Sequence, residues 1–318
     1  MKILFVWSGL TGYMGSCWRE LASRPGVDLK VVVDCANDVI GKGFNPSDVM
    51  AGLDWAPSLD AIGSWGPDVV FSVGWHNKVC RSAALRRWGA STKKVCCFDM
   101  PWEFKPRKFA ARFVLWRYLR NFDAAFVPGA SAARYARWLG FGENRIFCGL
   151  FSTDTHRFRL HKGGAGFLCV GRDAPEKGFD ILRAAHGLYK AKGGTWPLKI
   201  VSGVAPSELG PIYAEADCFV LASRCEPWGV VLAEAAAAGL PIICTDVCGA
   251  RHELVKGNGL VVKAGSARAL ADAMLKVGGK DGVLPDGELG RVLAKQYSCA
   301  AWADRVVGIC EKLAGDLP

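Results

Sequence analysis

The stretch LASRCEPWGVVLAEAAAAG, residues 221–239, decides the fold of this 318-residue chain. The apolar, strand-like residues 217–222 lead into it, and Pro227 and Gly229 precede an Ala-rich helical run. The order strand, loop, helix places Glu226 on a loop at the carboxyl end of a strand. We therefore expect a strand–loop–helix unit of an α/β sheet here.

Two chemical features of this stretch predict a ligand site. Trp228, Gly229 and Val230 stand at a helix N-terminus, where backbone N–H groups without an intrahelical acceptor bind anions. Glu226 and Glu234 lie on either side, and carboxylates accept strong hydrogen bonds from hydroxyl groups. Phosphates and hydroxyls together fit a nucleotide diphosphate sugar. The spacing alone fits equally a capped surface helix with two solvated glutamates.

A longer pattern extends this motif in both directions. Residues 226–254, EPWGVVLAEAAAAGLPIICTDVCGARHEL, resemble the donor-site signature of retaining glycosyltransferases of family four, the glycosyl transferases group 1. Residues 167–182, FLCVGRDAPEKGFDIL, resemble that family's G-R-x-x-x-x-K-G segment. The resemblance implies the GT-B fold, an α/β fold with two Rossmann-like domains facing a central cleft.

The length of the chain suits two domains of ordinary size. We expect an acceptor-side domain over residues 1–155 and a nucleotide-sugar donor domain over residues 162–297. The resemblance further implies that a C-terminal helix, residues 298–318, crosses back to the first domain. The donor domain is expected to be shortened, because the family usually has a further strand and helix after residues 198–201.

Two cations follow the expected strand at residues 167–170. Together they can neutralise a diphosphate without a metal: Arg172 through its forked guanidinium group, and Lys177 as a point charge. With Glu226 they form the predicted catalytic set, in which Glu226 holds sugar hydroxyls and Glu234 the ribose. We expect no side chain to act as a covalent nucleophile, and no metal or cofactor besides the donor substrate.

The glycine-rich residues 8–15 follow an expected strand at residues 3–7. Their G-x-x-G-x-x-G pattern differs from the dinucleotide fingerprint and fits a tight turn as well as a phosphate contact. In the resembled family this loop faces the donor phosphates, which implies donor contacts at Gly9 and Gly12.

Three polar or aromatic residues are placed to contact the acceptor. His76 follows the expected strand at residues 69–73, and Asp99 and Trp102 follow the strand at residues 94–98. Ligands of doubly wound sheets bind beyond the carboxyl ends of strands. His76 fits equally a loop histidine bonded to backbone, and Asp99 stands where family members often carry a histidine.

The charge of the chain is concentrated in its first half. The net charge is +10, and residues 1–150 hold 20 basic and 12 acidic residues, a net of +8. Such a surface attracts nucleic acid, an anionic membrane or an anionic substrate, or serves solubility. Residues 106–122 predict an amphipathic helix, either a core helix with a solvated basic side or a surface for anionic lipid or an anionic acceptor. Its basic residues are Arg107, Lys108, Arg112, Arg117 and Arg120.

Cysteine usage and hydropathy indicate the compartment. The thirteen cysteines include no CxxC pair or zinc-type spacing. We interpret them as reduced, buried residues of a cytoplasmic protein, peripheral on the inner face of the membrane. Without an apolar run of 18 residues, no membrane span is expected. The cysteines in apolar runs are Cys35, Cys96, Cys97, Cys169, Cys218 and Cys244.

The predicted function is transfer of a hexose, with retention, from a nucleotide diphosphate sugar to a hydroxyl of a sugar or lipid-linked acceptor. The context would be glycan, polysaccharide or glycolipid synthesis, with no nucleic-acid partner. One alternative is a sugar-nucleotide epimerase of the same fold, which would need acid–base carboxylates in the cleft. The other is a non-catalytic nucleotide-sugar-binding protein, against which the intact Arg172, Lys177, Glu226 and Glu234 argue.

Overall fold

The computed structural model describes residues 1–34, 46–160 and 162–315. The chain folds as two compact units: Met1–Ser152 with Cys299–Pro318, and Thr153–Ser298. The domain limits expected from the sequence, 155 and 297, fall close to these boundaries. Cys35, one of the cysteines interpreted as buried, and residues 161 and 316–318 lie outside the described residues.

The first unit is built on a sheet of seven described strands, all paired in parallel, in the order β3-β2-β1-β4-β5-β6-β7. Helices cover both faces, so most strand residues are apolar and buried. The strands are β1 (Lys2–Trp7), β2 (Asp28–Val33), β3 (Trp55–Ala56), β4 (Val69–Val73), β5 (Lys93–Cys97), β6 (Ala124–Val127) and β7 (Ile146–Cys148).

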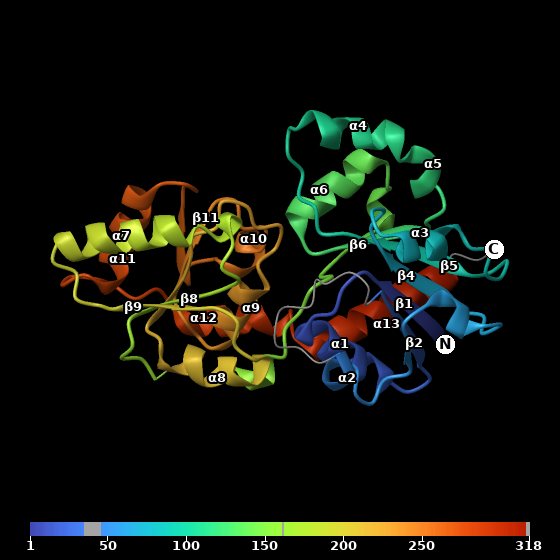
Figure 1. Ribbon diagram of the computed structural model, residues 1–318, viewed down its shortest axis with the longest axis horizontal. Helices are drawn as coiled ribbons and strands as arrows, with labels where there is room; N and C mark the ends of the chain where they lie inside the picture. Colours follow the sequence, from blue (N-terminus) through green and yellow to red (C-terminus); the bar gives the residue numbers. More distant parts are fainter. Residues whose placement is uncertain (35–45, 161, 316–318) are drawn as a thin grey trace. The chain divides into compact units, whose positions relative to one another are not determined.

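Helices of the first unit pack on both faces of the sheet. Alternate side chains of a strand point to opposite faces, so each face presents apolar side chains that helices cover. Ile3 and Phe5 pack against α1 and α13, while Leu4 and Val6 pack against α3. Figure 1 shows α13 beside α1. The helices are α1 (Gly12–Ala22), α2 (Pro46–Val49), α3 (Lys78–Leu85), α4 (Pro106–Val114), α5 (Trp116–Leu119), α6 (Ala130–Leu139) and α13 (Cys299–Gly315).

The C-terminal helix α13 is part of the core of the first unit. The ring of Phe5 stacks on Phe71, with centroids 4.6 Å apart, and lies 5.5 Å from the ring of Trp302 on α13. Trp302 is fully buried and donates its indole N–H to the carbonyl of Leu150, 2.8 Å away. The last helix therefore completes the hydrophobic core that residues before 152 begin.

The second unit contains a parallel sheet of five described strands in the order β12-β11-β10-β8-β9. Its strands are β8 (Phe167–Val170), β9 (Leu198–Val201), β10 (Cys218–Leu221), β11 (Ile242–Thr245) and β12 (Gly259–Val262). Its helices are α7 (Phe179–Ala191), α8 (Pro206–Glu215), α9 (Val230–Ala237), α10 (Arg251–Leu254), α11 (Ala267–Gly278) and α12 (Gly287–Lys295).

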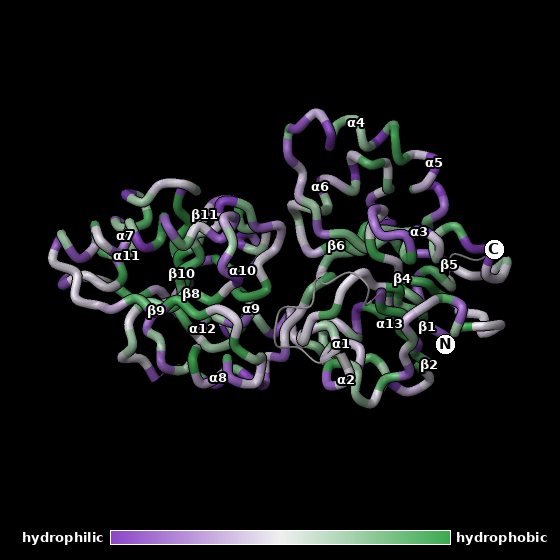
Figure 2. The backbone as a smooth tube through the Cα atoms, viewed as in Figure 1, coloured by the Kyte–Doolittle hydropathy of each residue, from purple (hydrophilic) through white to green (hydrophobic). Residues whose placement is uncertain are grey.

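Both faces of the second sheet are covered as well. On one face, α7 and α11 pack against Cys169 and Val220. On the other, Tyr213 of α8 stacks on Phe219, with ring centroids 5.6 Å apart. Figure 2 shows the central strands of each unit in the green of hydrophobic residues. The described cysteines in these runs are free and buried, as expected: Cys96, Cys97, Cys169, Cys218 and Cys244. Cys148 and Cys225 are exposed, so the interpretation as buried residues is wrong for these two.

The helix expected at residues 106–122 is two helices, α4 and α5, which meet at Leu115. No residue of α4 is buried, so its aromatic side is not part of the core. The interpretation as a core helix is therefore wrong for α4. Within the described residues, no helix combines the length and hydropathy that a membrane span requires.

One helix of the second unit lies where the sequence predicted none. Helix α12 follows Asp286, whose carboxylate accepts the N–H groups of Glu288 and Leu289 as an N-cap. The last helix begins at Cys299, one residue after the expected start at residue 298, and the carbonyl of Tyr297 before it accepts the N–H of Thr153, 2.8 Å away.

Candidate active site

The candidate active site lies where three neighbouring strands of the second sheet end. β8, β10 and β11 are adjacent and parallel, so their carboxyl ends share one edge. After β8, the carbonyl of Glu176 accepts the N–H of Arg224, 2.7 Å away, from the loop after β10. After β11, Gly249 donates its N–H to the carbonyl of Glu226, 3.0 Å away. Backbone hydrogen bonds thus join the three loops into one surface.

Two glycines allow these loops to approach so closely. Gly178 has a φ of 66°, and a Cβ there would lie 2.3 Å from the carbonyl oxygen of Ala222. A Cβ on Gly249 would lie 1.9 Å from the carbonyl oxygen of Pro227. Any larger residue at either position would push the loops apart.

The centre of the site is an ion pair between the first and second of these loops. Lys177 ends the short 3-10 helix Pro175–Lys177 after β8, and its Nζ lies 2.5 Å from Oε2 of Glu226. The Lys177 side chain is 16% exposed and that of Glu226 only 9%. Ser223 donates its hydroxyl to the same oxygen at 3.3 Å. Two opposite charges are therefore held, nearly buried, at the sheet edge.

The third predicted catalytic residue, Arg172, lies apart from this pair. Its side chain is 74% exposed, and its guanidinium is 3.3 Å from Oε1 of Glu176. Arg172 and Lys177 share one loop, but only Lys177 faces Glu226. The loop therefore carries one cation inside the site and one on the surface.

Helix α9 begins at Val230, directly after the loop of Glu226. Gly229 stands before it with a φ of 97°, a conformation that favours glycine. A Cβ on Gly229 would lie 3.2 Å from Cγ of Glu226, so this helix end adjoins the carboxylate. Trp228 is buried, with its ring 5.4 Å from that of Tyr297. Leu232 donates its N–H to the carbonyl of Gly229, 2.9 Å away, whereas the N–H groups at the very start of a helix have no acceptor within it, which suits an anion.

Glu234 lies further along α9 and is held by a neighbouring helix. It is buried, and the hydroxyl of Tyr213 on α8 donates to its Oε2 at 2.8 Å. Burial raises the pKa of Glu234 to about 7, against the opposing effects of the Tyr213 hydrogen bond and the charge of Arg157. At neutral pH this carboxyl group is therefore close to the midpoint of its titration.

The glycine-rich stretch of the first unit is mostly helix. Gly9 lies in the loop between β1 and α1, but Gly12 is the first residue of α1, with Thr11 as its N-cap. The expectation of a loop over residues 8–15 is therefore wrong from Gly12 onwards. Gly15 serves packing, because a Cβ there would lie 2.5 Å from the carbonyl oxygen of Val49. Donor contacts at Gly9 and Gly12 stay predictions.

The predicted acceptor residues follow adjacent strands of the first sheet. His76 comes after β4 and is exposed, with its ring 5.8 Å from Trp75. Asp99 and Trp102 come after β5 and are half-buried, and the Trp102 ring packs 5.0 Å from Trp138. These residues share the carboxyl edge of the sheet, where ligands of such sheets bind.

Sequence reasoning did not find Ser223 or Tyr213. Ser223 is buried beside Glu226, and its carbonyl accepts the hydroxyl of Thr245, 2.7 Å away. No local pattern links Tyr213 to Glu234, because they lie on different helices. In the part of the chain that the structure describes, no three His, Cys, Asp or Glu side chains gather as a metal site.

Comparisons with known proteins agree with this architecture. Residues 167–280 match the family model for glycosyl transferases group 1. Over 121 residues the chain is 36% identical to a putative teichuronic acid biosynthesis glycosyltransferase, TuaC, of Bacillus subtilis, a match that covers 34% of this chain. The chain covers 31% of that relative's length and 30% of a second curated relative's, so it spans under a third of each.

Solved structures resemble the chain over nearly its whole length. A lipopolysaccharide outer core galactosyltransferase, WaaB, has a TM-score of 0.68 at 14% identity, covering 98% of this chain and 99% of that one. Anabaena Alr3699/HepE in complex with UDP-glucose also has a TM-score of 0.68, at 16% identity, covering 99% of this chain and 100% of that one. The fold is therefore that of GT-B glycosyltransferase structures, and the match to the group 1 family model lies within the second unit.

Proposed function

We propose that this protein transfers a sugar from a nucleotide diphosphate sugar to a hydroxyl group of an acceptor. The observation that carries the proposal is the nearly buried Lys177–Glu226 pair beside the N-terminus of α9. A cation and helix N–H groups suit a diphosphate, and a carboxylate suits sugar hydroxyls. The structure of Alr3699/HepE with UDP-glucose, on the same fold, supports a donor of this class.

The chemical difficulty in such a transfer is departure of the diphosphate. Negative charge grows on the leaving phosphate, while the sugar becomes oxocarbenium-like. Lys177, Arg172 and the first turn of α9 supply preorganised positive groups for that charge. Glu226 then accepts sugar hydroxyls and Glu234 accepts ribose hydroxyls. We infer that no metal ion is required, because these groups supply the charge that a metal would supply.

The finer assignments rest on the family resemblance and belong to the same proposal. We expect hexose transfer with retention at the anomeric carbon, without a covalent nucleophile from the chain. His76, Asp99 and Trp102 are the proposed acceptor contacts, and Gly9 and Gly12 the proposed contacts from the first unit to the donor. Synthesis of a glycan, polysaccharide or glycolipid is the proposed context.

We further propose a cytoplasmic protein that associates with the inner face of the membrane. The excess positive charge of residues 1–150 and the uncovered side of α4 support this. An anionic leaflet attracts each nearby Lys or Arg by about 1 kcal/mol. A lipid-linked acceptor would then be delivered by the same surface.

The proposal is tested by incubating the protein with a panel of nucleotide sugars and following release of nucleotide. Release that needs Glu226 and Lys177, and that increases with a hydroxyl acceptor, is the expected result. The anomeric configuration of the product, read by NMR, tests retention. Conversion of the donor to an epimer without nucleotide release would instead identify an epimerase. Binding without any turnover would identify a binding protein.

A further inference from the structure

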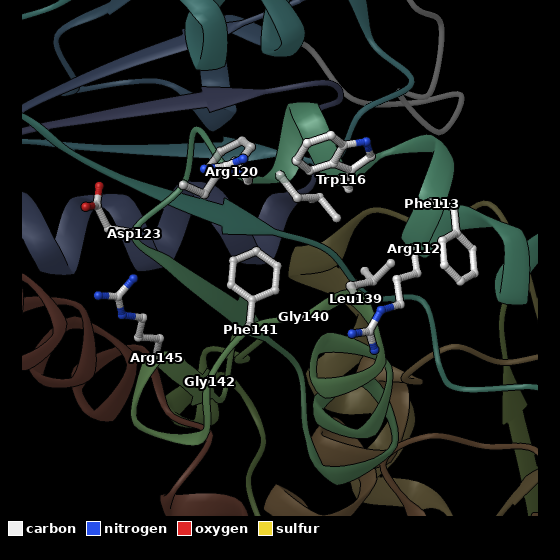
Figure 3. A pocket seen from close by; sticks show the side chains of 12 residues that line it. Arg112, Phe113, Trp116, Arg120, Asp123, Leu139, Gly140, Phe141, Gly142 and Arg145 are labelled. Atoms are coloured by element: carbon white, nitrogen blue, oxygen red, sulfur yellow. The ribbon is translucent and has the colours of Figure 1, made fainter.

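The first unit contains a cavity of about 640 Å³ that has no role in the proposed transfer. Figure 3 shows the ring of Phe141 at its centre, with Arg145 and Asp123 on one side and Arg112 on the other. Arg120 and Trp116 lie together across from Phe141. The cavity thus combines three arginines with an aromatic lining.

The cavity lies at the sheet edge opposite the predicted acceptor residues. Asp123 directly precedes β6 and Arg145 directly precedes β7, so both stand at the amino ends of parallel strands. His76 and Asp99 instead follow the carboxyl ends of β4 and β5. A ligand in this cavity is therefore distinct from a hydroxyl acceptor bound at the carboxyl edge.

Two of the three arginines of the cavity contact aromatic rings, and none of the three forms an ion pair among the described residues. Arg120 lies over the ring of Trp116, 5.3 Å from its centroid. Arg112 lies 5.6 Å from the ring centroid of Trp138 and donates to the carbonyl of the same residue at 3.2 Å. Among the described residues, no ion pair involves Arg112, Arg120 or Arg145.

The single carboxylate of the cavity is engaged by its own sheet. Asp123 accepts the backbone N–H of Lys94 at 2.8 Å, and the ammonium of Lys93 lies 4.0 Å away. The lining residues therefore carry three positive charges against one satisfied negative charge. Arginine forks bind phosphate oxygens through paired, charge-assisted hydrogen bonds.

Exposed apolar side chains occur in the lining of this cationic cavity, at Phe113 and Trp116, and elsewhere on α4 and in the loop before it. Phe113 is 62% exposed and Val114 76%, both at the end of α4, and Trp116 on α5 is 48% exposed. Phe104, in the loop before α4, is 91% exposed. Exposed large apolar groups beside arginines are typical of segments that lie in the interface of a bilayer. A soluble anion would account for the arginines but would leave these side chains in water.

We propose that this cavity binds the phosphate headgroup of an anionic membrane lipid, with Phe113, Val114 and Trp116 entering the interface around it. Arg112, Arg120 and Arg145 receive the phosphate. The inference deepens the membrane association in the proposed function by giving it a defined lipid site. It does not depend on the sugar-transfer chemistry. An acidic protein partner fits the arginines, but the exposed aromatic side chains favour lipid.

The test is co-sedimentation with vesicles of phosphatidylcholine, with and without phosphatidylglycerol, in the absence of nucleotide sugar. Arg145→Ala is compared with Arg107→Ala, which removes the same charge from an exposed site outside the cavity. A diffuse attraction would weaken by about fivefold in either variant, since each basic residue contributes about 1 kcal/mol. A defined headgroup site predicts a loss of more than about tenfold in Arg145→Ala alone. Equal losses in the two variants would overturn the proposal.

A second pair of variants tests the aromatic rim. Phe113→Asp should abolish binding to the anionic vesicles, while Leu85→Asp, at an apolar site on α3 that is 53% exposed, should not. Wild-type binding to neutral vesicles equal to that to anionic ones would also refute the lipid site. The proposal also fails if the protein binds no vesicles. Binding of free glycerol phosphate would then indicate a soluble phosphate ligand, and binding of neither would favour an acidic protein. If vesicles bind as expected but no sugar is transferred, only the proposed sugar transfer fails.

Discussion

Two candidate sites of this chain, one in each unit, hold their cations in opposite settings. In the second unit, Lys177 is nearly buried and lies 2.5 Å from the Glu226 carboxylate at the end of a sheet. In the first unit, Arg145 is exposed and lines a cavity with aromatic residues, and no ion pair joins it to a carboxylate among the described residues. The first setting fixes one charge in place at a cost in desolvation, whereas the second leaves several charges solvated.

The difference indicates what each site is suited to bind. The Lys177–Glu226 pair is surrounded by loops that are hydrogen-bonded to one another. A ligand that binds there must replace contacts that the pair already makes, so the site discriminates between ligands. Solvated arginines beside exposed rings lose few existing contacts when a ligand binds. They therefore favour a lipid headgroup, which a membrane presents at high local concentration. The two sites therefore differ in how strongly a single substitution should affect folding and function.

The largest expected effect comes from breaking the buried pair. Lys177→Met leaves the Glu226 carboxylate buried without its cation, which should lower the free energy of unfolding of the second unit by about 3–5 kcal/mol. The double variant with Glu226→Gln should recover most of that loss. Chemical denaturation measures both. As a control, Lys192→Met, from an exposed ion pair with Asp272, should cost no more than about 1 kcal/mol. A stable single variant would show that the pair is not held as described.

The second effect concerns catalysis instead of folding. Arg172→Ala should leave unfolding unchanged, because the side chain is 74% exposed. It should raise the barrier to sugar transfer by about 2.7–4 kcal/mol if Arg172 stabilises the leaving diphosphate. Initial rates at saturating donor measure this, with the exposed Arg183→Ala on α7 as a matched control. Near-normal turnover of Arg172→Ala would remove Arg172 from the catalytic set and leave Lys177 as the cation of the site.

The third effect is a pH dependence of stability from Glu234. Its pKa is about 7 in the folded protein and 4.5 in the unfolded chain, so the folded state binds the proton more tightly. Stability is therefore lost as the pH rises from about 4.5 to about 7, on the order of 3 kcal/mol in total. The side chain in Glu234→Gln cannot ionise. The variant's free energy of unfolding relative to the wild type should therefore rise across this pH range and then stay constant. Thermal melts at several pH values test this, and Glu311→Gln on the surface should show no such change.

The smallest expected effect is that of metal removal. If Lys177, Arg172 and the end of α9 supply the positive charge for the diphosphate, a strong chelator should leave the rate of transfer unchanged. Activity lost in chelator and restored by magnesium or manganese would show that this cationic set is insufficient. The assay needs only the wild-type protein and a donor identified from the panel.

The sequence allowed the main elements to be predicted where their signals are local. The apolar strand β10, Gly229 and the Ala-rich α9 follow one another, and their order alone indicates strand, loop and helix. The GT-B fold of the whole chain followed from the resemblance of residues 226–254 and 167–182, and the solved structures confirm it.

Features that depend on residues far apart in the chain could not be predicted from the sequence. Lys177 and Glu226 are 49 positions apart, and only the pairing of β8 with β10 brings them together. The same motif contains Arg172, and no local pattern distinguishes the exposed cation from the buried one. The periodicity of residues 106–122 likewise indicates an apolar side, but whether that side is buried depends on what packs against α4.

Lys177, Glu226 and the N-terminus of α9 are proposed to form a diphosphate-sugar site. Titration calorimetry with a panel of nucleoside diphosphates and the matching nucleosides tests it most directly. Wild-type protein should bind a diphosphate, and Lys177→Met should lose at least about tenfold in affinity for it, with affinity for the nucleoside unchanged. Equal affinity of wild type and a folded Lys177→Met protein for every diphosphate that binds would contradict it.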